Sequence, residues 1–317
     1  MPYFELIVGL LFVLAVLDLT VGVSNDAVNF LNSAIGSRVA SRRVILLIAG
    51  LGVLAGSLFS SGIMEVARKG IFNPEMFVFA DVMIVFLAVM LADVLLLDLF
   101  NTFGLPTSTT VSIVFELLGA SLAVALIIVT GNPDAGSIID YVNWQRATVI
   151  VGGIGLSIIV AFFLGTLVQF FSRLIFTFEE RNHTAAIKVG WSAIAFTVIS
   201  FFLLFKGLKG ASFITAETYS FVLDNVFPFT AAMLAVWMLI MWLLDRLKID
   251  ILAIVVLGGT FSLALAFASN DLVNFIGVPL AGLSAFTVAS GSENLAGQTM
   301  EALAEPVRAN TLFLLIA

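Results

Sequence analysis

Long apolar runs separated by short polar segments dominate the chain. A transmembrane helix needs about 20 mainly apolar residues, because each residue adds about 1.5 Å along the helix axis. Eight runs meet this requirement, and a ninth begins near Thr311. We therefore predict an all-α polytopic membrane protein with spans at residues 3–23, 43–64, 76–99, 109–130, 147–172, 186–206, 225–245 and 250–268.

Two polar segments between the spans differ from ordinary loops. Residues 24–42 are too many for a tight turn and too amphipathic for a span, so we predict a half-helix or re-entrant piece covered by protein. Residues 101–110 carry no charge, which is typical of a loop at membrane depth. Pro106 suits a first helical turn and the hydroxyls after it suit an N-cap, so we predict a helix N-terminus within 107–110.

The remaining connections have the composition of solvated loops. We expect an exposed loop at residues 131–144, a charged loop at 173–188 and a further loop at 206–219.

One seven-residue segment occurs twice. Ser-Asn-Asp-Ala-Val-Asn-Phe at 24–30 returns as Ser-Asn-Asp-Leu-Val-Asn-Phe at 269–275, with a single difference. Both copies place a carboxylate at the end of an apolar run, where an ionisable group is costly and usually functional. Carboxylate and amide oxygens are the hard ligands that a dehydrated alkali cation requires. The residues concerned are Asn25, Asp26, Asn29, Asn270, Asp271 and Asn274. A plain helix-capping role for these residues is the alternative.

The two copies also predict an internal symmetry. Seven predicted spans precede the span that carries the second copy, so the two copies enter the membrane from opposite sides if every span crosses. This parity predicts an inverted-repeat transporter with broken or re-entrant helices. We assign residues 1–224 to a first repeat with its connecting spans and 225–317 to the start of a second. Because the chain stops inside an apolar run at Leu312–Ala317, we expect that the second repeat is incomplete.

The segment at 107–110 offers the chemistry of an anion site. Ser108, Thr109 and Thr110 supply hydroxyls at a helix start, where backbone N–H groups and the helix dipole favour negative charge. No basic residue lies nearby, so the anion would be held by neutral donors and by a co-bound cation that reverses the local sign. A simple Ser/Thr N-cap is equally compatible with this segment.

Composition narrows the function classes. The chain is 61% hydrophobic and 11% charged, far from the quarter or so of charged residues in soluble domains. The net charge of −7 provides no basic surface for nucleic acid. With no Cys and only His183, which lies in the charged loop, the chain lacks the usual zinc or haem ligands and shows no nucleophile–base set. We therefore expect no enzyme, no cofactor and no metal other than a sodium ion.

Acidic residues outnumber basic ones within the apolar runs. They are Asp18, Asp81, Asp93, Asp98, Glu116 and Asp224. Such a surplus fits a cation or proton route through the membrane. For any one of them, a helix end or a hydrogen-bonded structural carboxylate is the plainer interpretation.

Taken together, these motifs resemble the inorganic phosphate transporter family, which comprises sodium- or proton-coupled phosphate permeases and sulfate-carrying relatives. The copies at 23–30 and 268–275 are similar to its Gly-Ala-Asn-Asp-Val-Ala-Asn-Ala signature, and 104–110 looks like its Gly-Leu-Pro-Val-Ser-Thr-Thr-His segment. The resemblance implies substrate binding by Ser108, Thr109, Thr110, Asn25 and Asn270, and cation binding by Asp26, Asn29, Asp271 and Asn274. It also implies a homodimer with re-entrant hairpins.

The chain departs from the family pattern at three points. Ser, Val and Phe replace small residues beside Asn-Asp, which could shift the substrate towards sulfate. Val111 stands where the family has His, and no second Pro-Ser-Thr-Thr segment follows Asp271. We predict a permease in the plasma or inner membrane that imports phosphate, free or as a metal complex, by alternating access with Na⁺ or H⁺. The alternatives are a sulfate permease and a passive small-ion channel.

Overall fold

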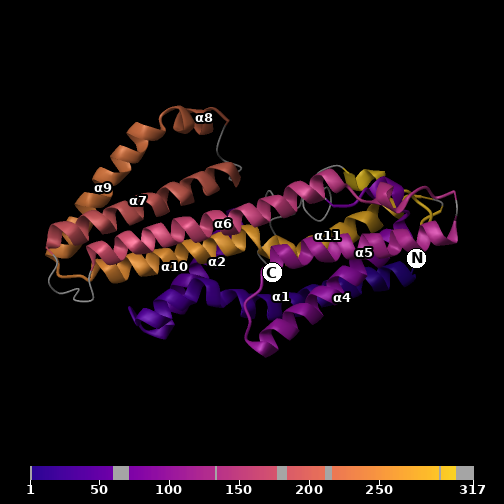
Figure 1. The fold of residues 1–317 in the computed structure, drawn as a ribbon, viewed down its shortest axis with the longest axis horizontal. Helices are drawn as coiled ribbons and strands as arrows, with labels where there is room; N and C mark the ends of the chain where they lie inside the picture. Colours follow the sequence, from indigo (N-terminus) through magenta and orange to yellow (C-terminus); the bar gives the residue numbers. More distant parts are fainter. Residues whose placement is uncertain are drawn as a thin grey trace. The chain divides into compact units, whose positions relative to one another are not determined.

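The computed structural model describes residues 2–59, 71–132, 134–176, 184–210, 216–292 and 294–304. Over these residues the chain is almost entirely helical, and its only extended pairings are the isolated bridges Phe72–Val142 and Val78–Thr299. The helices, shown in Figure 1, are α1 (Pro2–Ser37), α2 (Arg42–Phe59), α4 (Phe79–Phe103), α5 (Thr109–Gly131), α6 (Trp144–Ile175), α7 (Ala185–Gly210), α8 (Ala216–Asp224), α9 (Val226–Arg246), α10 (Ile251–Asn270) and α11 (Leu272–Ala289). Short 3₁₀ turns are η1 (Pro74–Met76), η2 (Ile138–Tyr141) and η4 (Glu301–Ala304).

The membrane-protein prediction is confirmed in its main features. Within the described residues, seven helical stretches have the length and composition to cross a membrane. They are Tyr3–Ser37, Phe79–Phe103, Thr109–Gly131, Trp144–Ile175, Ala185–Leu204, Val226–Arg246 and Ile251–Ala289. The predicted span at 43–64 corresponds to α2, and its last five positions lie outside the described residues. The ninth span expected near Thr311 also lies outside them.

Three local predictions were wrong. Residues 24–37 do not form a separate half-helix, because α1 continues without a break to Ser37. The helix α11 was not predicted, because Pro279 and the polar motif before it interrupt the apolar pattern. The segment 131–144 is not wholly exposed, since the Tyr141 and Val142 side chains are buried.

Two further loops were predicted only in part. In the segment 206–219, α7 continues to Gly210 and α8 starts at Ala216. In the segment 173–188, α6 ends at Ile175 and α7 begins at Ala185, while residues 177–183, with His183, lie outside the described residues.

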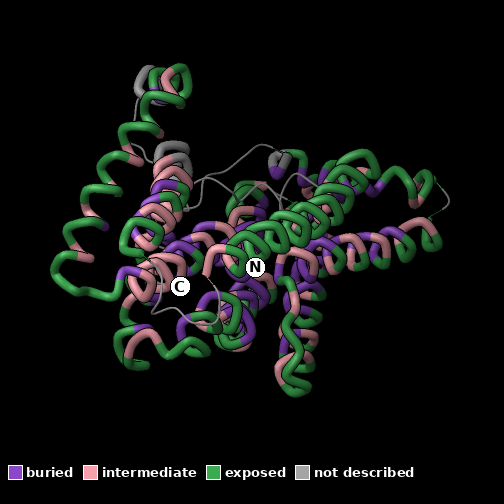
Figure 2. The backbone as a smooth tube through the Cα atoms, turned by 60° about the vertical axis from the view of Figure 1, so that its left-hand side comes forward, coloured by how far each residue is buried: buried purple, intermediate pink, exposed green. Residues whose placement is uncertain are grey.

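The chain divides into two compact units. The first comprises Met1–Val28, Ser60–Gly153 and Phe267–Ala317, and the second comprises Asn29–Phe59 and Ile154–Ala266. The first unit therefore contains residues 24–28 of the first Ser-Asn-Asp motif, the whole second motif and the start of α5. Burial is concentrated where helices pack, and long exposed runs lie elsewhere, as Figure 2 shows.

In the first unit, α4 packs along both α5 and α11. One face of α4 is fully buried at Val82, Met83, Phe86, Val89 and Met90. The spacing of these positions follows the helical period, so a single stripe of apolar side chains supplies most of the core. The C-terminal segment closes this core at one end, where the Phe79 N–H donates to the carbonyl oxygen of Gln298 at 2.8 Å.

Close approach of α1 and α11 depends on Gly22. A Cβ atom at this position would collide with the ring of Phe275, a side chain that is fully buried. The ring therefore has no open space into which it can swing. Gly22 lies three residues before Asn25, so this contact fixes α1 against α11 beside the first motif.

The second unit contains α7 and α9 packed along each other, with α2 against α7. Its buried core includes Val189, Ala193, Met241 and Ile251, and partly buried aromatic side chains surround this group.

We predict that Gly22→Ala destabilises the protein by about 1–3 kcal/mol, because the added methyl group overpacks the contact with Phe275. The matched control is Gly9→Ala on the same helix, where a Cβ atom meets nothing within 4 Å. Alanine is the better helix former, so the control should hold or slightly raise the melting temperature. Thermal unfolding in detergent measures both, and equal melting temperatures would contradict the packing described here.

Candidate functional site

The turn between α4 and α5 sets up the first functional segment. Helix α4 ends at Gly104, which has φ 65° in the left-handed region that glycine adopts without strain. Its N–H and that of Leu105 donate to the carbonyl oxygens of Asn101 and Phe100, which closes the helix. Ser108 then caps α5, and its hydroxyl accepts from the N–H of Val111 at 3.4 Å. The predicted helix start within 107–110 is confirmed.

Asn25 ties α1 to this turn through its whole side-chain amide. Its Nδ2 donates to Asn101 Oδ1 at 2.9 Å and to the carbonyl oxygen of Leu105 at 3.0 Å. Its Oδ1 accepts from the N–H of Thr107 at 2.9 Å. Asn101 in turn donates to the carbonyl oxygen of Val21 at 2.8 Å. We call Asn25 and Asn101 the amide clamp, because together they fix the loop before α5 against α1.

Thr110 connects the start of α5 to the second motif. Its hydroxyl donates to Asp271 Oδ1 at 3.0 Å and accepts from Asn274 Nδ2 at 3.0 Å. Asn274 Nδ2 also approaches Asp271 Oδ1 at 3.5 Å. We call these three residues the polar triad. Asp271 and Asn274 follow Thr110 by 161 and 164 positions in the sequence, yet all three are hydrogen-bonded at the N-terminus of α5.

The second motif lies where α10 meets α11. Helix α10 ends at Asn270, Asp271 occupies the N-cap position of α11, and α11 begins at Leu272. Asp271 keeps helical backbone angles (φ −96°, ψ −23°), and its N–H donates to the carbonyl oxygen of Phe267 at 2.7 Å. The second copy therefore lies at a one-residue irregularity in a long helical stretch, whereas the first copy lies inside the continuous α1. Two nearly identical segments thus have different backbone settings.

Asp26 completes the meeting of the two motifs. Its side chain is 5% exposed, and its charge interacts with those of Asp271 and Asp93. No Lys, Arg or His occurs in α1, α4, α5 or α11, so these helices supply no permanent positive charge to the acids. The charges of Asp26, Asp93 and Asp271 repel one another, which favours binding of a cation or a proton.

The other predicted site residues have different settings. Thr109 is buried, Asn270 is half-buried, and Asn29 is exposed and belongs to the second unit. Ser108 uses its hydroxyl as the N-cap. Asn25 and Asn29 lie about one helical turn apart on α1, yet Asn25 is buried and Asn29 is exposed.

Two polar residues were missed by the sequence reasoning. Asn101 is half of the amide clamp, and Ser112 donates to Asp93 Oδ1 or Glu116 Oε1 at 2.8 and 2.7 Å. Asn101 could have been recognised as an amide at the end of a long apolar run. Ser112 follows the Thr-Thr pair by two positions and gave no separate signal in the sequence.

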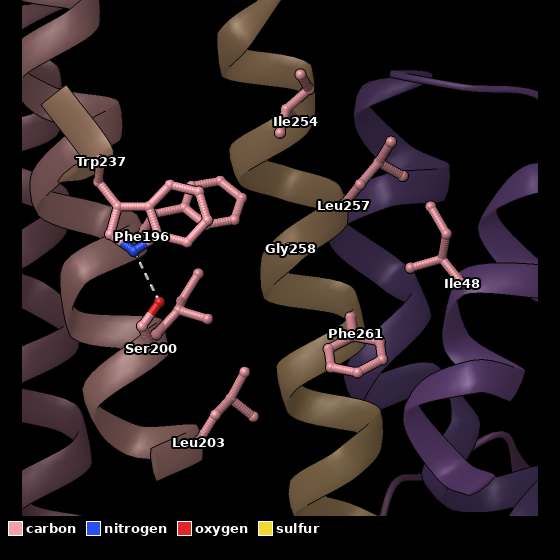
Figure 3. Close-up of a pocket in the computed structure, with 10 residues that line it drawn as sticks. Ile48, Phe196, Ser200, Leu203, Trp237, Ile254, Leu257, Gly258 and Phe261 are labelled. Atoms are coloured by element: carbon pink, nitrogen blue, oxygen red, sulfur yellow. Dashed lines mark hydrogen bonds between the residues drawn. The ribbon is translucent and has the colours of Figure 1, made fainter. Parts of the chain in front are cut away.

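A cavity of about 420 Å³ in the second unit has a different character. Figure 3 shows it between side chains of α2, α7, α9 and α10, lined by apolar residues such as Phe196 and Leu257. The Trp237 indole N–H donates to the hydroxyl of Ser200, another residue of the lining, at 2.9 Å. The lining includes no charged residue, so this cavity lacks the groups that an ion site needs.

The chain has relatives among transport proteins. Residues 22–303 match the model of the phosphate transporter family. A protein of Thermococcus kodakarensis is 28% identical over 83% of this chain and 63% of its own length. A protein of Pyrococcus furiosus is 28% identical over 84% of this chain and 62% of its own length. One of Helicobacter pylori is 30% identical over 59% of this chain and 33% of its own length. All three carry the name "Putative phosphate permease".

The chain thus spans less than two thirds of the length of these relatives. A solved structure described as "The sodium-dependent phosphate transporter" matches with a TM-score of 0.62 at 23% identity, over 95% of this chain and 72% of that chain. This likeness concerns the fold.

The match to the family model covers both Ser-Asn-Asp motifs, the amide clamp and the polar triad. The family is one of transporters and not of enzymes, and its members span membranes several times, as the helices here also indicate. The chain belongs to the phosphate transporter family.

Proposed function

We propose that this protein imports inorganic phosphate across a membrane together with a cation, by alternating access. The observation that carries the proposal is the polar triad. Thr110, at the first turn of α5, is hydrogen-bonded to Asp271 and Asn274 of the second motif. The N-terminus of α5 attracts an anion, whereas the Asp271 carboxylate beside it repels one. A cation bound at Asp271 removes this repulsion, so the anion and the cation can bind together.

The chemistry of the site divides between its parts. Thr109 and the first N–H groups of α5 offer donors to phosphate oxygens. The Thr110 hydroxyl donates to Asp271 here and becomes a donor to phosphate once a cation takes its place at Asp271. Asp26, Asp271 and the neighbouring amides offer oxygens to Na⁺ or H⁺. The amide clamp holds the α4–α5 turn, so the donors are in place before the substrate arrives. Preorganised donors bind an anion more tightly than donors that must be ordered on binding.

The coupled cycle follows from linkage. A cation that neutralises Asp26 and Asp271 raises the affinity for phosphate, and phosphate raises the affinity for the cation by the same factor. Accumulation against a gradient then needs a change that exposes the loaded site to the other side. The irregularity at Asp271, between α10 and α11, is the feature that we expect to open into a helix break during such a change, because broken helices carry the sites of many secondary transporters.

The inverted repeat, a homodimer and a location in the plasma or inner membrane remain part of this proposal. The name of the solved relative includes sodium dependence, which supports Na⁺ as one candidate ion.

We predict that Asp26→Asn and Asp271→Asn each abolish cation-dependent phosphate uptake while the protein still reaches the membrane. Each change keeps the shape of the side chain but removes the charge that attracts the cation. The measurement is radiolabelled phosphate uptake into proteoliposomes under imposed Na⁺ and H⁺ gradients. Asp98→Asn is the matched control, because Asp98 is exposed. Uptake that keeps its cation dependence in both variants would contradict the role of these acids.

We predict that Thr110→Val raises the apparent Michaelis constant for phosphate by about 5- to 100-fold. The change leaves Asp271 and Asn274 without their shared hydroxyl, and a lost buried hydrogen bond costs about 1–3 kcal/mol. Thr109→Val should act in the same direction. The control is Thr130→Val at the other end of α5, whose hydroxyl is exposed and bonds only its own helix. A constant unchanged by Thr110→Val would leave Thr110 as a structural cap.

The same assay separates the alternatives. A phosphate transporter takes up phosphate in preference to sulfate and accumulates it above the external concentration. A passive channel reaches equal concentrations only, and an ionophore for Na⁺ or H⁺ does not change its endpoint. Preference for sulfate would instead make the protein a sulfate permease.

A further inference from the structure

Three carboxyl groups gather inside the first unit, apart from the two motifs. Asp18 of α1 and Asp93 of α4 are both fully buried, and Glu116 of α5 is half-buried. Ser112 lies between Asp93 and Glu116, at 2.8 Å from Asp93 Oδ1 and 2.7 Å from Glu116 Oε1. Asp18 lies within interaction distance of Asp93. We call Asp18, Asp93, Glu116 and Ser112 the acidic cluster.

The hydrogen-bond geometry of Ser112 requires a proton on the cluster. A serine hydroxyl carries a single hydrogen and can donate to one acceptor only. Two carboxyl oxygens nevertheless approach its oxygen at hydrogen-bond distance. Both contacts are favourable only if Ser112 donates to one carboxylate and accepts from the other as a protonated acid. An ionised pair would leave one short oxygen–oxygen contact without a hydrogen.

Asp18 gives a second, independent indication. Its side chain is 0% exposed, and no hydrogen-bond donor within the described part of the chain reaches either of its oxygens. It faces Asp93, whose Oδ2 is also buried without a donor. Two facing carboxyl groups form a hydrogen bond only when one of them is protonated. A bare carboxylate in such a place costs several kcal/mol, which a shared proton removes.

The helices that carry and surround the cluster hold no basic residue. Helix α1 also carries Glu5 near its start and Asp26 two turns beyond Asp18, while α4 adds Asp81 and Asp98. Helix α5 has no titratable residue except Glu116, and α11 has none between Leu272 and Ala289, although Asp271 precedes it. Every charged group on these packed helices is therefore acidic. Arg146, the basic residue of the first unit within the described ranges, is exposed.

We propose that the acidic cluster is a proton-binding site, separate from the Asp26–Asp271 site, and that its proton enters with phosphate during each transport cycle. This inference rests on the proposed function and names the proton as a coupling ion. Asp93 interacts electrostatically with Asp26, so a change of charge in the cluster reaches the substrate site. A proton on the cluster lowers the repulsion on an incoming anion, and release of that proton raises it again.

The test compares Glu116→Gln and Asp93→Asn with the protein of natural sequence in proteoliposomes. Both variants mimic the protonated acid and cannot release a proton. We expect that they lose accumulation of phosphate driven by an acid-outside pH gradient, but keep phosphate exchange at equal pH on both sides. Asp98→Asn, on the same helix but exposed, should retain both activities. Gradient-driven accumulation that survives in both cluster variants would overturn the proposal.

A second measurement is independent of transport. Infrared spectroscopy of the reconstituted protein at neutral pH should show the carbonyl band of a protonated, unhydrated carboxyl group. This band should shrink in Glu116→Gln or Asp93→Asn and persist in Asp98→Asn. A spectrum without the band, or one that is the same in all variants, would overturn the proposal.

Folding failure and functional failure can be told apart. If Glu116→Gln does not reach the membrane, Ser112→Ala keeps all three acids and removes only the bridge. We expect it to shift the pH dependence of phosphate uptake, and an unshifted profile would count against the cluster. If the natural protein takes up no phosphate under any gradient, the proposed function fails, while the infrared band still decides whether the cluster holds a proton.

Discussion

The hydrogen bond from Thr110 to Asp271 is the interaction on which the site depends. It joins the first turn of α5 to the junction between α10 and α11, and so it brings the hydroxyls of one motif to the carboxylate of another. A buried carboxylate needs hydrogen-bond donors or a bound cation, because its desolvation is otherwise too costly. The desolvation cost of the Asp271 carboxylate favours the hydrogen bond from Thr110, and it also favours binding of a cation. The same electrostatic cost therefore explains both the contact and the ion site.

The packing around this contact holds α1, α11 and the α4–α5 turn in place. Gly22 allows α1 to approach Phe275, and the amide clamp fixes the α4–α5 turn against α1. As a result, four helices present polar groups to one region, while buried apolar side chains of the same helices form a core. These four helices thus hold their acids without any basic residue of their own, so an added positive charge is favoured there.

Much of this arrangement could be predicted from the sequence. The apolar runs predicted most of the long helices, the Pro-Thr-Ser-Thr-Thr segment predicted the start of α5, and the repeated motif pointed to Asp26 and Asp271. The predictions were wrong where the local sequence pattern and the tertiary packing favour different structures. Polar residues in 24–37 suggested a break, yet packing carries α1 through them, and Pro279 hid a helix that is almost wholly buried. Asn101 and Ser112 gained their roles only from neighbours distant in the sequence, which no single-chain pattern reveals.

The central claim is that anion and cation occupy one compartment built by the two motifs. Calorimetric titration of the purified protein with phosphate, at a series of Na⁺ concentrations and pH values, tests it most directly. The account predicts that phosphate affinity rises as Na⁺ or H⁺ concentration increases, and that cation affinity rises by the same factor with phosphate. Phosphate binding that is unchanged by either cation would contradict it.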